Sequence, residues 1–306
     1  MSNNNFIIKP FLKWVGGKTQ IIYDILSSFP STINNYYEPF LGGGSVLLAV
    51  LSYVKIGNIK IEGNIYASDL NPYLVGLYIN IQKNCNIFIN ELQKIIDEFN
   101  KCNNTCINRK PNNINDALTS RESYYFWIRN SFNQLSFNDK ISPYGSAMFL
   151  FLNKTGFRGM YREGPNGLNV PYGNYINPSI FDEEHIKSIS ILIKDVIFIT
   201  CPFTDALNNI MTNDFIYLDP PYAPENDKSF VSYTYTGFNL DDNNKLFDVC
   251  KKINEKKIKF VMSNSNVKLV TDQFNSSSFN IKVITCRRSI NSKNPQSTTQ
   301  EVLISN

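Results

Sequence analysis

Short apolar segments, each ending at a polar or acidic residue, recur along this 306-residue chain and alternate with segments of helical periodicity. Continuous apolar strands separated by helices are typical of a parallel sheet that is covered on both faces. The rhythm therefore predicts an α/β fold with a mostly parallel sheet. The predicted strands lie at 35–40, 64–69, 196–200, 215–219 and 258–263, with helical spacing at 45–53 and 240–255.

Two further strand patterns, at 279–286 and 299–305, close the chain and predict a β-hairpin with one antiparallel strand. Residues 73–182 break the rhythm of strands and helices. We therefore predict a sheet domain made of 1–72 and 183–306, and an inserted, mainly helical domain at 73–182. Within the insert we expect helices at 87–101 and 120–153, an asparagine-rich stretch at 103–115, and a segment rich in Gly, Arg, Asn and Pro at 156–175.

Composition narrows the class of protein. Hydrophobic residues make up 42% of the chain, and no apolar run approaches the about 18 residues that a membrane span needs. The N-terminus lacks the pattern of a signal peptide, and six scattered cysteines with one histidine offer no second ligand pair for zinc. We expect a cytoplasmic protein without metal or membrane partners. The net charge of +4 permits an anionic partner without requiring one.

The segment 11–20, FLKWVGGKTQ, ends like a phosphate-binding P-loop. A P-loop has the pattern G-x-x-x-x-G-K-[ST], because successive backbone amides must curl around the phosphates. Five positions before Gly17 stands Leu12, and no clear strand precedes the segment. The sequence therefore argues against ATP binding at this position.

A second glycine segment, EPFLGGGS at 38–45, follows a predicted strand and opens a predicted helix. This is the position at which an open α/β sheet binds its cofactor. Asp69 stands at the end of the next strand, 25 residues after Gly44. A carboxylate at that position typically holds the ribose hydroxyls of an adenosine-type cofactor.

The most informative motif is Asp219-Pro220-Pro221-Tyr222, which ends a predicted strand. An ordinary strand terminus explains one proline but leaves the acid, the second proline and the aromatic residue unexplained. The exocyclic amine of a purine is a poor nucleophile, because its lone pair is delocalised into the ring. Two acceptors, the Asp219 carboxylate and the Pro220 carbonyl, favour a pyramidal nitrogen, and Tyr222 offers a flat face to the base.

Together these motifs resemble those of the Dam-type adenine-N6 DNA methyltransferases (D12 class, α-group), which use S-adenosylmethionine. The resemblance runs from about residue 11 to residue 304 and weakens at 84–118. Its order is cofactor motif, recognition region and DPPY. The matching segments are FLKWVGGK (11–18), EPFLGGGS (38–45), SDLN (68–71), NKTGFRGMYR (153–162), NVPYGNY (169–175), DPPY (219–222) and RRSI (287–290).

The resemblance implies a Rossmann-like methyltransferase sheet, with the inserted helical domain reading a target sequence in double-stranded DNA. It further implies that the target adenine is flipped out of the duplex, with Asp219, Pro220, Pro221 and Tyr222 as catalytic residues. In this family the KWxGGK stretch packs against the cofactor, and the lysine is expected to meet the cofactor's carboxylate. The implied cofactor contacts are Trp14, Lys18, Glu38, Phe40, Gly42, Gly44, Ser45, Asp69 and Asp219.

The same resemblance implies GATC as the target. Arg162 corresponds to a residue that contacts a guanine edge, Lys13 to a second guanine contact, and Phe157 to an aromatic residue inserted where the adenine has left. The full implied DNA-binding set is Lys13, Phe157, Arg158, Met160, Arg162, Asn169, Pro171 and Tyr175. The expected phosphate partners are Lys154, Arg158, Arg287, Arg288 and Lys293. The segment 229–236 is expected to clamp the backbone or close over the base.

Two residues depart from the family pattern. Dam-type enzymes often carry a smaller polar residue at the position of Arg158, and a phosphate-binding arginine at the position of Asn174. The first departure bears on the orphaned partner base, and the second removes one expected backbone contact.

Other functions remain open at this stage. Methylation of cytosine-N4 or of a protein glutamine uses the same fold, but those motifs usually begin with Ser or Asn rather than Asp219. A DNA-binding relative without activity is disfavoured by the intact motifs. The sequence leaves open whether a cognate restriction endonuclease acts on the same site.

Overall fold

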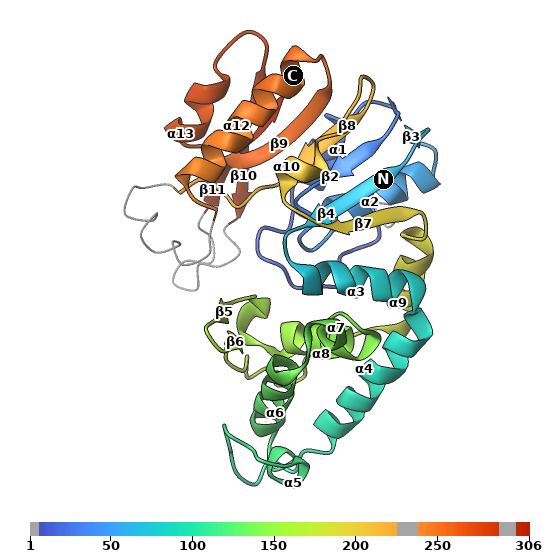
Figure 1. Ribbon diagram of the computed structural model, residues 1–306, viewed down its shortest axis with the longest axis vertical. Coiled ribbons are helices and arrows are strands. Elements are labelled where there is room, and N and C mark those ends of the chain that lie inside the picture. The colour runs from blue at the N-terminus through green and yellow to red at the C-terminus, as the bar shows by residue number, and fades with distance from the viewer. Residues whose placement is uncertain (1–5, 225–237, 288–297) are drawn as a thin grey trace. The chain divides into compact units, whose positions relative to one another are not determined.

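A large, mostly parallel sheet forms where the sequence predicts one (Figure 1). The computed structural model describes residues 6–224, 238–287 and 298–306. Within these ranges, seven strands pair in the order β10-β11-β9-β8-β2-β4-β7, and β11 runs antiparallel to both neighbours while the other pairs are parallel. The predicted antiparallel C-terminal pair is therefore confirmed. The strands are β2 (Tyr36–Glu38), β4 (Ile65–Asp69), β7 (Val196–Thr200), β8 (Phe215–Leu218), β9 (Lys259–Ser265), β10 (Asn280–Arg287) and β11 (Thr298–Ser305).

The strand order reverses next to β2. From β2 the chain adds β4 and then β7 in one direction, and it returns to place β8 on the other side of β2. In open α/β sheets, ligands bind outside the carboxyl ends of the strands at such a reversal. The topology thus indicates the residues that end β2, β4 and β8 as candidates for ligand binding.

By its internal contacts the chain divides into two compact units, which we call the sheet unit and the helical unit. The sheet unit comprises Lys18–Leu41, Ser45–Leu70 and Asp195–Asn306. Besides the large sheet it holds the short parallel pair β1 (Thr32–Ile33) and β3 (Lys60–Ile61). Its helices are α1 (Ile22–Leu26), α2 (Ser45–Lys55), α10 (Phe203–Ala206), α12 (Leu240–Glu255), α13 (Lys268–Thr271) and the 3-10 turn η3 (Asp272–Phe274).

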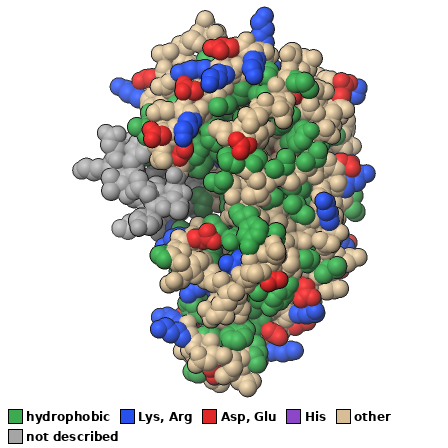
Figure 2. All heavy atoms as spheres, viewed as in Figure 1, with side chains coloured by type: hydrophobic (Ala, Val, Ile, Leu, Met, Phe, Trp, Pro, Cys, Tyr) green, Lys and Arg blue, Asp and Glu red, His purple; other side chains and the backbone are tan. Residues whose placement is uncertain are grey.

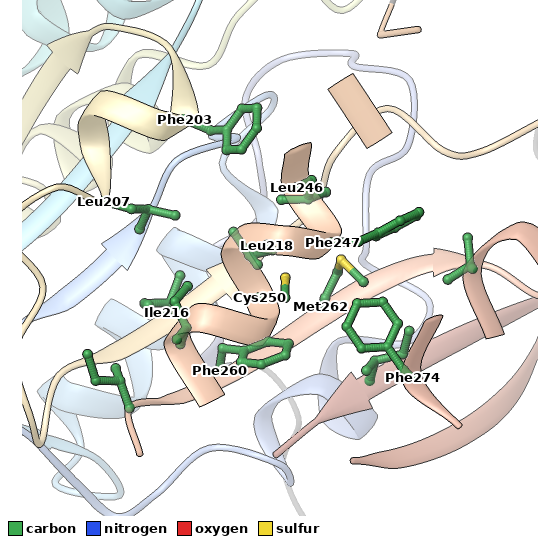
Figure 3. Packing of buried hydrophobic residues seen from close by; sticks show 14 of the residues in the cluster. Phe203, Leu207, Ile216, Leu218, Leu246, Phe247, Cys250, Phe260, Met262 and Phe274 are labelled. Atoms are coloured by element: carbon green, nitrogen blue, oxygen red, sulfur yellow. The ribbon is translucent and has the colours of Figure 1, made fainter. Parts of the chain in front are cut away.

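Both faces of the sheet are buried at its central strands β2, β8 and β9, as their continuous apolar runs predict, whereas the edge strand β7 is partly exposed. Successive side chains of a strand point to opposite faces. Tyr37 of β2 and Ile216 of β8 belong to the cluster beneath α12, whereas the ring of Phe29 packs at a tilt against Tyr36 and Phe215. Figure 3 shows the α12 cluster, in which Leu246, Phe247 and Cys250 of the helix meet Ile216, Leu218, Phe260 and Met262 of β8 and β9.

Helix α12 follows a 3.6-residue pattern with one apolar face. Asn239 caps its N-terminus in a capping box with Asp242, so two backbone N–H groups of the first turn are satisfied. Its other face carries charges of both signs, and in Figure 2 Lys, Arg, Asp and Glu side chains are interspersed on the surface in the region of α12. The helix therefore covers the sheet with one side and meets water with the other.

The helical unit comprises Met1–Gly17, Gly42–Gly44 and Asn71–Lys194. It is wider than the predicted insert of 73–182, because the N-terminal segment, the glycine turn and the residues up to Lys194 make their contacts here. Its elements are α3 (Pro72–Lys83), α4 (Cys85–Asn100), α5 (Ile114–Ala117), α6 (Arg121–Gln134), α7 (Phe137–Lys140), α8 (Pro143–Thr155), η2 (Phe157–Gly159), the hairpin β5 (Glu163–Gly164) and β6 (Gly167–Leu168), and α9 (Glu183–Leu192).

The prediction of one helical segment over 120–153 is wrong in detail, since three helices occupy it. Ser136 and Ser142 each cap a new helix, accepting hydrogen bonds from the backbone N–H groups of Asp139 and Gly145. Pro143 follows directly, and a proline disfavours helical backbone in the residue before it. Serine followed by proline was the signal for this break. No helix within the described residues is long and apolar enough to span a membrane.

The cluster beneath α12 provides a stability prediction. Phe247 is 1% exposed, and Phe247→Ala is expected to lower the free energy of unfolding by about 3–5 kcal/mol, because it leaves a cavity. The measurement is urea unfolding. Leu240→Ala is the control on the same helix, since Leu240 is 43% exposed and its loss should change the free energy by less than about 0.5 kcal/mol. Equal losses in the two variants would contradict the assigned packing.

Candidate active site

Three acidic residues stand at one edge of the sheet unit. Glu38 ends β2, Asp69 ends β4, and Asp219 directly follows β8. Because β8, β2 and β4 are adjacent and parallel, their carboxyl ends lie at the same edge. Sequence reasoning named all three, and the topology brings their strands together at the reversal of strand order.

Asp219 is held by a buried lysine. The Nζ atom of Lys18 lies 2.8 Å from Asp219 Oδ1, and the side chain of Lys18 is only 2% exposed. The backbone N–H of Lys18 donates to Ser45 Oγ at 3.1 Å, which anchors the lysine at the start of α2. Burial raises the pKa of Asp219 to about 6, against the opposing effect of Lys18. At neutral pH Asp219 is therefore a carboxylate.

Glu38 is also a buried acid, but its partner is a neutral hydroxyl group instead of an ammonium. It is 2% exposed, and Tyr36, two residues earlier on the same face of β2, donates its hydroxyl to Glu38 Oε2 at 2.6 Å. Burial raises the pKa of Glu38 to about 8, and the Tyr36 hydrogen bond opposes this rise only in part. At neutral pH Glu38 is therefore largely protonated, so it can donate a hydrogen bond.

Tyr222 is fixed by Lys18 and by three residues that sequence reasoning missed, Glu301, Asn264 and Ser265. Its hydroxyl donates to Glu301 Oε2 at 2.6 Å, and Lys18 Nζ lies 4.7 Å from its ring centroid. Asn264 and Ser265 of β9 bond the backbone of the next residue, Ala223. An acidic residue within the predicted strand at 299–305 was the available signal for Glu301, but its partner depends on strand register.

Phe40 lies in an aromatic group of the sheet unit. Its ring stacks on Phe203 at 5.3 Å between centroids and meets Phe238 edge-on at 5.8 Å. The backbone beside it is tied to β4, since the N–H of Leu41 donates to the carbonyl of Ser68 at 2.9 Å. Phe40 is thus a partly buried aromatic residue that lies just after the carboxyl end of β2.

The glycine turn of the helical unit accepts no side chain. Gly42 and Gly44 have φ of +48° and +66°, a conformation that glycine adopts without strain. A Cβ on Gly42 or Gly43 would meet the Trp14 ring or its Cβ at 3.0 Å and 2.9 Å, and one on Gly44 would clash with Tyr78. Trp14 itself stacks on Tyr161 at 5.9 Å. Glycine at these positions therefore lets Trp14 and Tyr78 pack directly against the backbone of the turn.

Residues predicted to bind DNA gather around Asn153 in the helical unit. The amide of Asn153 accepts from the N–H of Lys13 and donates to the carbonyls of Lys13 and Gly159. The ammonium of Lys13 donates to the Lys154 carbonyl at 3.1 Å and lies 3.9 Å from the Tyr175 ring centroid. Burial and Lys13 lower the pKa of Lys154 to about 8. Asn153 is a positioning residue that sequence reasoning missed.

The remaining DNA candidates are mostly on the surface. Arg162 Nε donates to Asn169 Oδ1 at 2.7 Å, and its Nη2 donates to the Asn169 carbonyl at 3.2 Å. Phe157 and Met160 are 41% and 37% exposed. The N–H of Phe157 donates to the carbonyl of Pro171 at 2.8 Å, so these two predicted residues are directly linked.

The two residues that depart from the family pattern share a backbone feature. Arg158 and Asn174 have φ of 56° and 52°, the left-handed region that asparagine tolerates better than arginine. The N–H of Arg158 donates to the Tyr175 hydroxyl at 3.0 Å. The turn around Arg158 is therefore held by the same tyrosine that covers Lys13.

Some of the residues predicted to contact DNA are not in the described part of the chain. The segment 229–236, Arg288 and Lys293 lie outside the described residues, as does the side chain of Arg287. In the part of the chain that is described, no group of three or more His, Cys, Asp or Glu residues is arranged to hold a metal.

Comparison with known proteins identifies relatives over nearly the whole chain. Residues 14–290 match the model of the family described as D12 class N6 adenine-specific DNA methyltransferase. The chain is 36% identical to the Type II methyltransferase M.MjaIII of Methanocaldococcus jannaschii, covering 94% of each chain. It is 28% identical to the Type II methyltransferase M1.LlaDCHI of Lactococcus lactis, covering 96% of this chain and 93% of the relative. It is 31% identical to a DNA adenine methylase of Haemophilus influenzae, covering 94% and 89%.

The raised pKa of Glu38 predicts how stability depends on pH. A group whose pKa is higher in the folded state favours folding below its ordinary pKa, and this contribution is lost as pH rises through about 4.5 to 8. Glu38→Gln should remove a slope of up to about 1.4 kcal/mol per pH unit from the free energy of unfolding. Chemical denaturation between pH 5 and pH 8 measures it.

Glu62→Gln is the matched control for Glu38→Gln. Glu62 is 52% exposed in a surface ion pair with Lys60, so its substitution should leave the pH dependence of stability unchanged. Parallel curves for wild type and Glu38→Gln would show that Glu38 ionises normally in the folded protein.

Proposed function

We propose that this protein methylates the adenine of GATC in double-stranded DNA after flipping the adenine from the duplex. The chain belongs to the D12 class of N6 adenine-specific DNA methyltransferases. As a member of this class, the protein is a DNA adenine-N6 methyltransferase. The target sequence, base flipping and the residue roles below are our proposals.

The observation that carries the catalytic proposal is the Lys18–Asp219 pair next to Pro220. An adenine amine needs acceptors for its hydrogens, and a protonated Asp219 would accept poorly. Lys18 keeps the pKa of Asp219 from rising beyond about 6, so the carboxylate form is present at neutral pH. We assign to Asp219 and the Pro220 carbonyl the orientation of the amine, and to Tyr222 stacking with the base.

Lys18 then acquires a different role from the one implied by resemblance. Its ammonium already contacts the Asp219 carboxylate and the Tyr222 ring. We propose that it is the counter-charge of Asp219, in place of a partner for the cofactor's carboxylate.

The residues present fit S-adenosylmethionine. The glycine turn with Trp14 against it, the acid at the end of β4 and the aromatic ring of Phe40 suit a cofactor with an adenosine part. When bound, this cofactor supplies an activated methyl group. We propose Trp14, Glu38, Phe40, Gly42, Gly44, Ser45, Asp69 and Asp219 as the residues that hold or border it. Glu38, being largely protonated, can donate as well as accept a hydrogen bond.

We propose that the helical unit reads the target, in the role expected of the inserted domain. Arg162 supports this, because Asn169 orients its guanidinium without neutralising its charge. An oriented guanidinium suits the O6 and N7 acceptors of guanine. Lys13 is the proposed second guanine contact, and the exposed ring of Phe157 is proposed to fill the space left by the adenine. Met160, Pro171 and Tyr175 are proposed to border the bases.

A partner enzyme is a further proposal. Two relatives carry the name Type II methyltransferase, which supports a role beside a restriction endonuclease that cuts the same sequence. The methylase would then protect the sites that the endonuclease recognises.

A labelling experiment tests the function. The protein is incubated with methyl-labelled S-adenosylmethionine and three duplexes, which carry GATC, the same bases scrambled, or GATC with both adenines already methylated. We expect label only in the unmethylated GATC duplex, and a loss of at least about a hundredfold in kcat for Asp219→Ala. Label in the scrambled duplex would remove the GATC assignment, and full activity of Asp219→Ala would remove the catalytic one.

A second experiment tests the reader. Arg162→Ala should lower kcat/KM on GATC by about tenfold to a hundredfold and relax discrimination at one base pair, as expected for a lost bidentate contact. Arg109→Ala is the matched control, because its Nε is also held at 2.7 Å, but by the carboxylate of Glu122. Equal effects of the two substitutions would mean that Arg162 contributes only general charge.

A further inference from the structure

The hydroxyl of Tyr222 has a partner on a distant strand. Glu301 lies on β11, the antiparallel member of the large sheet, and accepts the Tyr222 hydroxyl hydrogen at 2.6 Å. Burial, together with the charges of Asp219 and Glu301, raises the pKa of Tyr222 far above its ordinary value. The hydroxyl therefore keeps its proton and remains a donor to Glu301.

Strand register brings Glu301 to this position. Glu301 pairs with Ser265 of β9, and the Ser265 hydroxyl donates to the carbonyl of Ala223 at 2.6 Å. Next to it, Asn264 Oδ1 accepts from the N–H of Ala223 at 3.1 Å. Two neighbouring strands thus hold the side chain of Tyr222 and both backbone polar groups of the residue after it.

The ring of Tyr222 is constrained at two points. Lys18 Nζ lies 4.7 Å from the ring centroid, and Glu301 holds the hydroxyl at the far end of the ring. A tyrosine side chain has two rotatable bonds, and its hydroxyl oxygen lies on the axis of the second. The bond to Glu301 therefore limits rotation about the first, and the ammonium of Lys18 against the ring limits rotation about the second. Without Glu301, the contact with Lys18 and the backbone bonds of Ala223 would leave the tip of the ring unsupported.

We propose that Glu301 is a positioning residue for methyl transfer, which holds the Tyr222 ring through its hydroxyl in the orientation that receives the target adenine. The proposal rests on the stacking role of Tyr222 in the proposed function. Glu301 acts through Tyr222 and touches neither substrate nor cofactor in this role. Its effect is on the rate, because a misplaced base loses alignment with the groups that orient its amine.

A double-variant cycle tests the proposal. Glu301→Ala and Tyr222→Phe are each expected to lower kcat by about tenfold, and the double variant should lose no more than the worse single one, because both remove the same bond. Glu301→Gln keeps an acceptor and should retain kcat within about threefold. The dissociation constant for S-adenosylmethionine should change by less than about twofold in each variant.

Gln300→Ala is the control on the same strand, since Gln300 is exposed and bonds only Asn266 in side-chain contacts among the described residues. It should leave kcat unchanged. Losses that multiply to about a hundredfold in the double variant would overturn the proposal, because they would mean that Glu301 and Tyr222 act independently. A second result would also overturn the proposal. If Glu301→Gln lowers the unfolding midpoint while kcat is unchanged in both Glu301→Gln and Tyr222→Phe, Glu301 contributes to stability alone.

Tyr222→Ala separates this proposal from the function on which it rests. It removes the ring, whereas Tyr222→Phe removes only the hydroxyl. A greater loss of kcat in Tyr222→Ala is expected if the base stacks on the ring. Equal losses in the two variants would overturn the stacking role, whatever the double variant shows for Glu301.

Discussion

The Lys18–Asp219 pair is the interaction on which the chemistry of this site depends. Breaking a buried ion pair by removing one partner costs about 3–5 kcal/mol, because the other charge is left without compensation. Lys18 is 2% exposed, so removing Asp219 would leave a buried ammonium. The pair therefore links stability to the proposed catalytic role of Asp219, because the same lysine that stabilises a carboxylate after β8 also keeps it charged.

Glu38 and Asp219 show how one edge of a sheet holds two acids in different states. Both are raised in pKa by burial, to about 8 for Glu38 and about 6 for Asp219. The difference follows from their partners, since Asp219 has an ammonium and Glu38 has a neutral phenol donor. When the environments of two titratable groups push their pKa values apart, the groups take different roles. Here Asp219 is the acceptor, and Glu38 can also donate.

Local pattern predicted the parts of this site that are local. The sequence predicts strands from apolar runs that end in Glu38, Asp69 and Asp219. Because these strands are parallel, their carboxyl ends lie side by side. The Tyr222–Glu301 bond was beyond such reasoning, because it joins residues 79 positions apart through the register of β9 and β11. Asn153 was missed for the same reason, since it meets Lys13 across 140 positions. A one-residue slip of β11 against β9 would send the Glu301 side chain to the opposite face of the sheet.

The site residues also differ in how firmly the backbone holds them. Glu38 and Asp69 end paired strands, and Asp219 follows one whose four residues are all buried. The predicted reader residues lie on turns, where Arg158, Gly159 and Asn174 have positive φ and a few side-chain bonds set the conformation. If these turns contact DNA as we propose, substitutions on them would change the DNA contacts without changing the buried pair of Lys18 and Asp219. In a chain built this way, the target sequence can diverge between relatives while the methyl-transfer chemistry is retained.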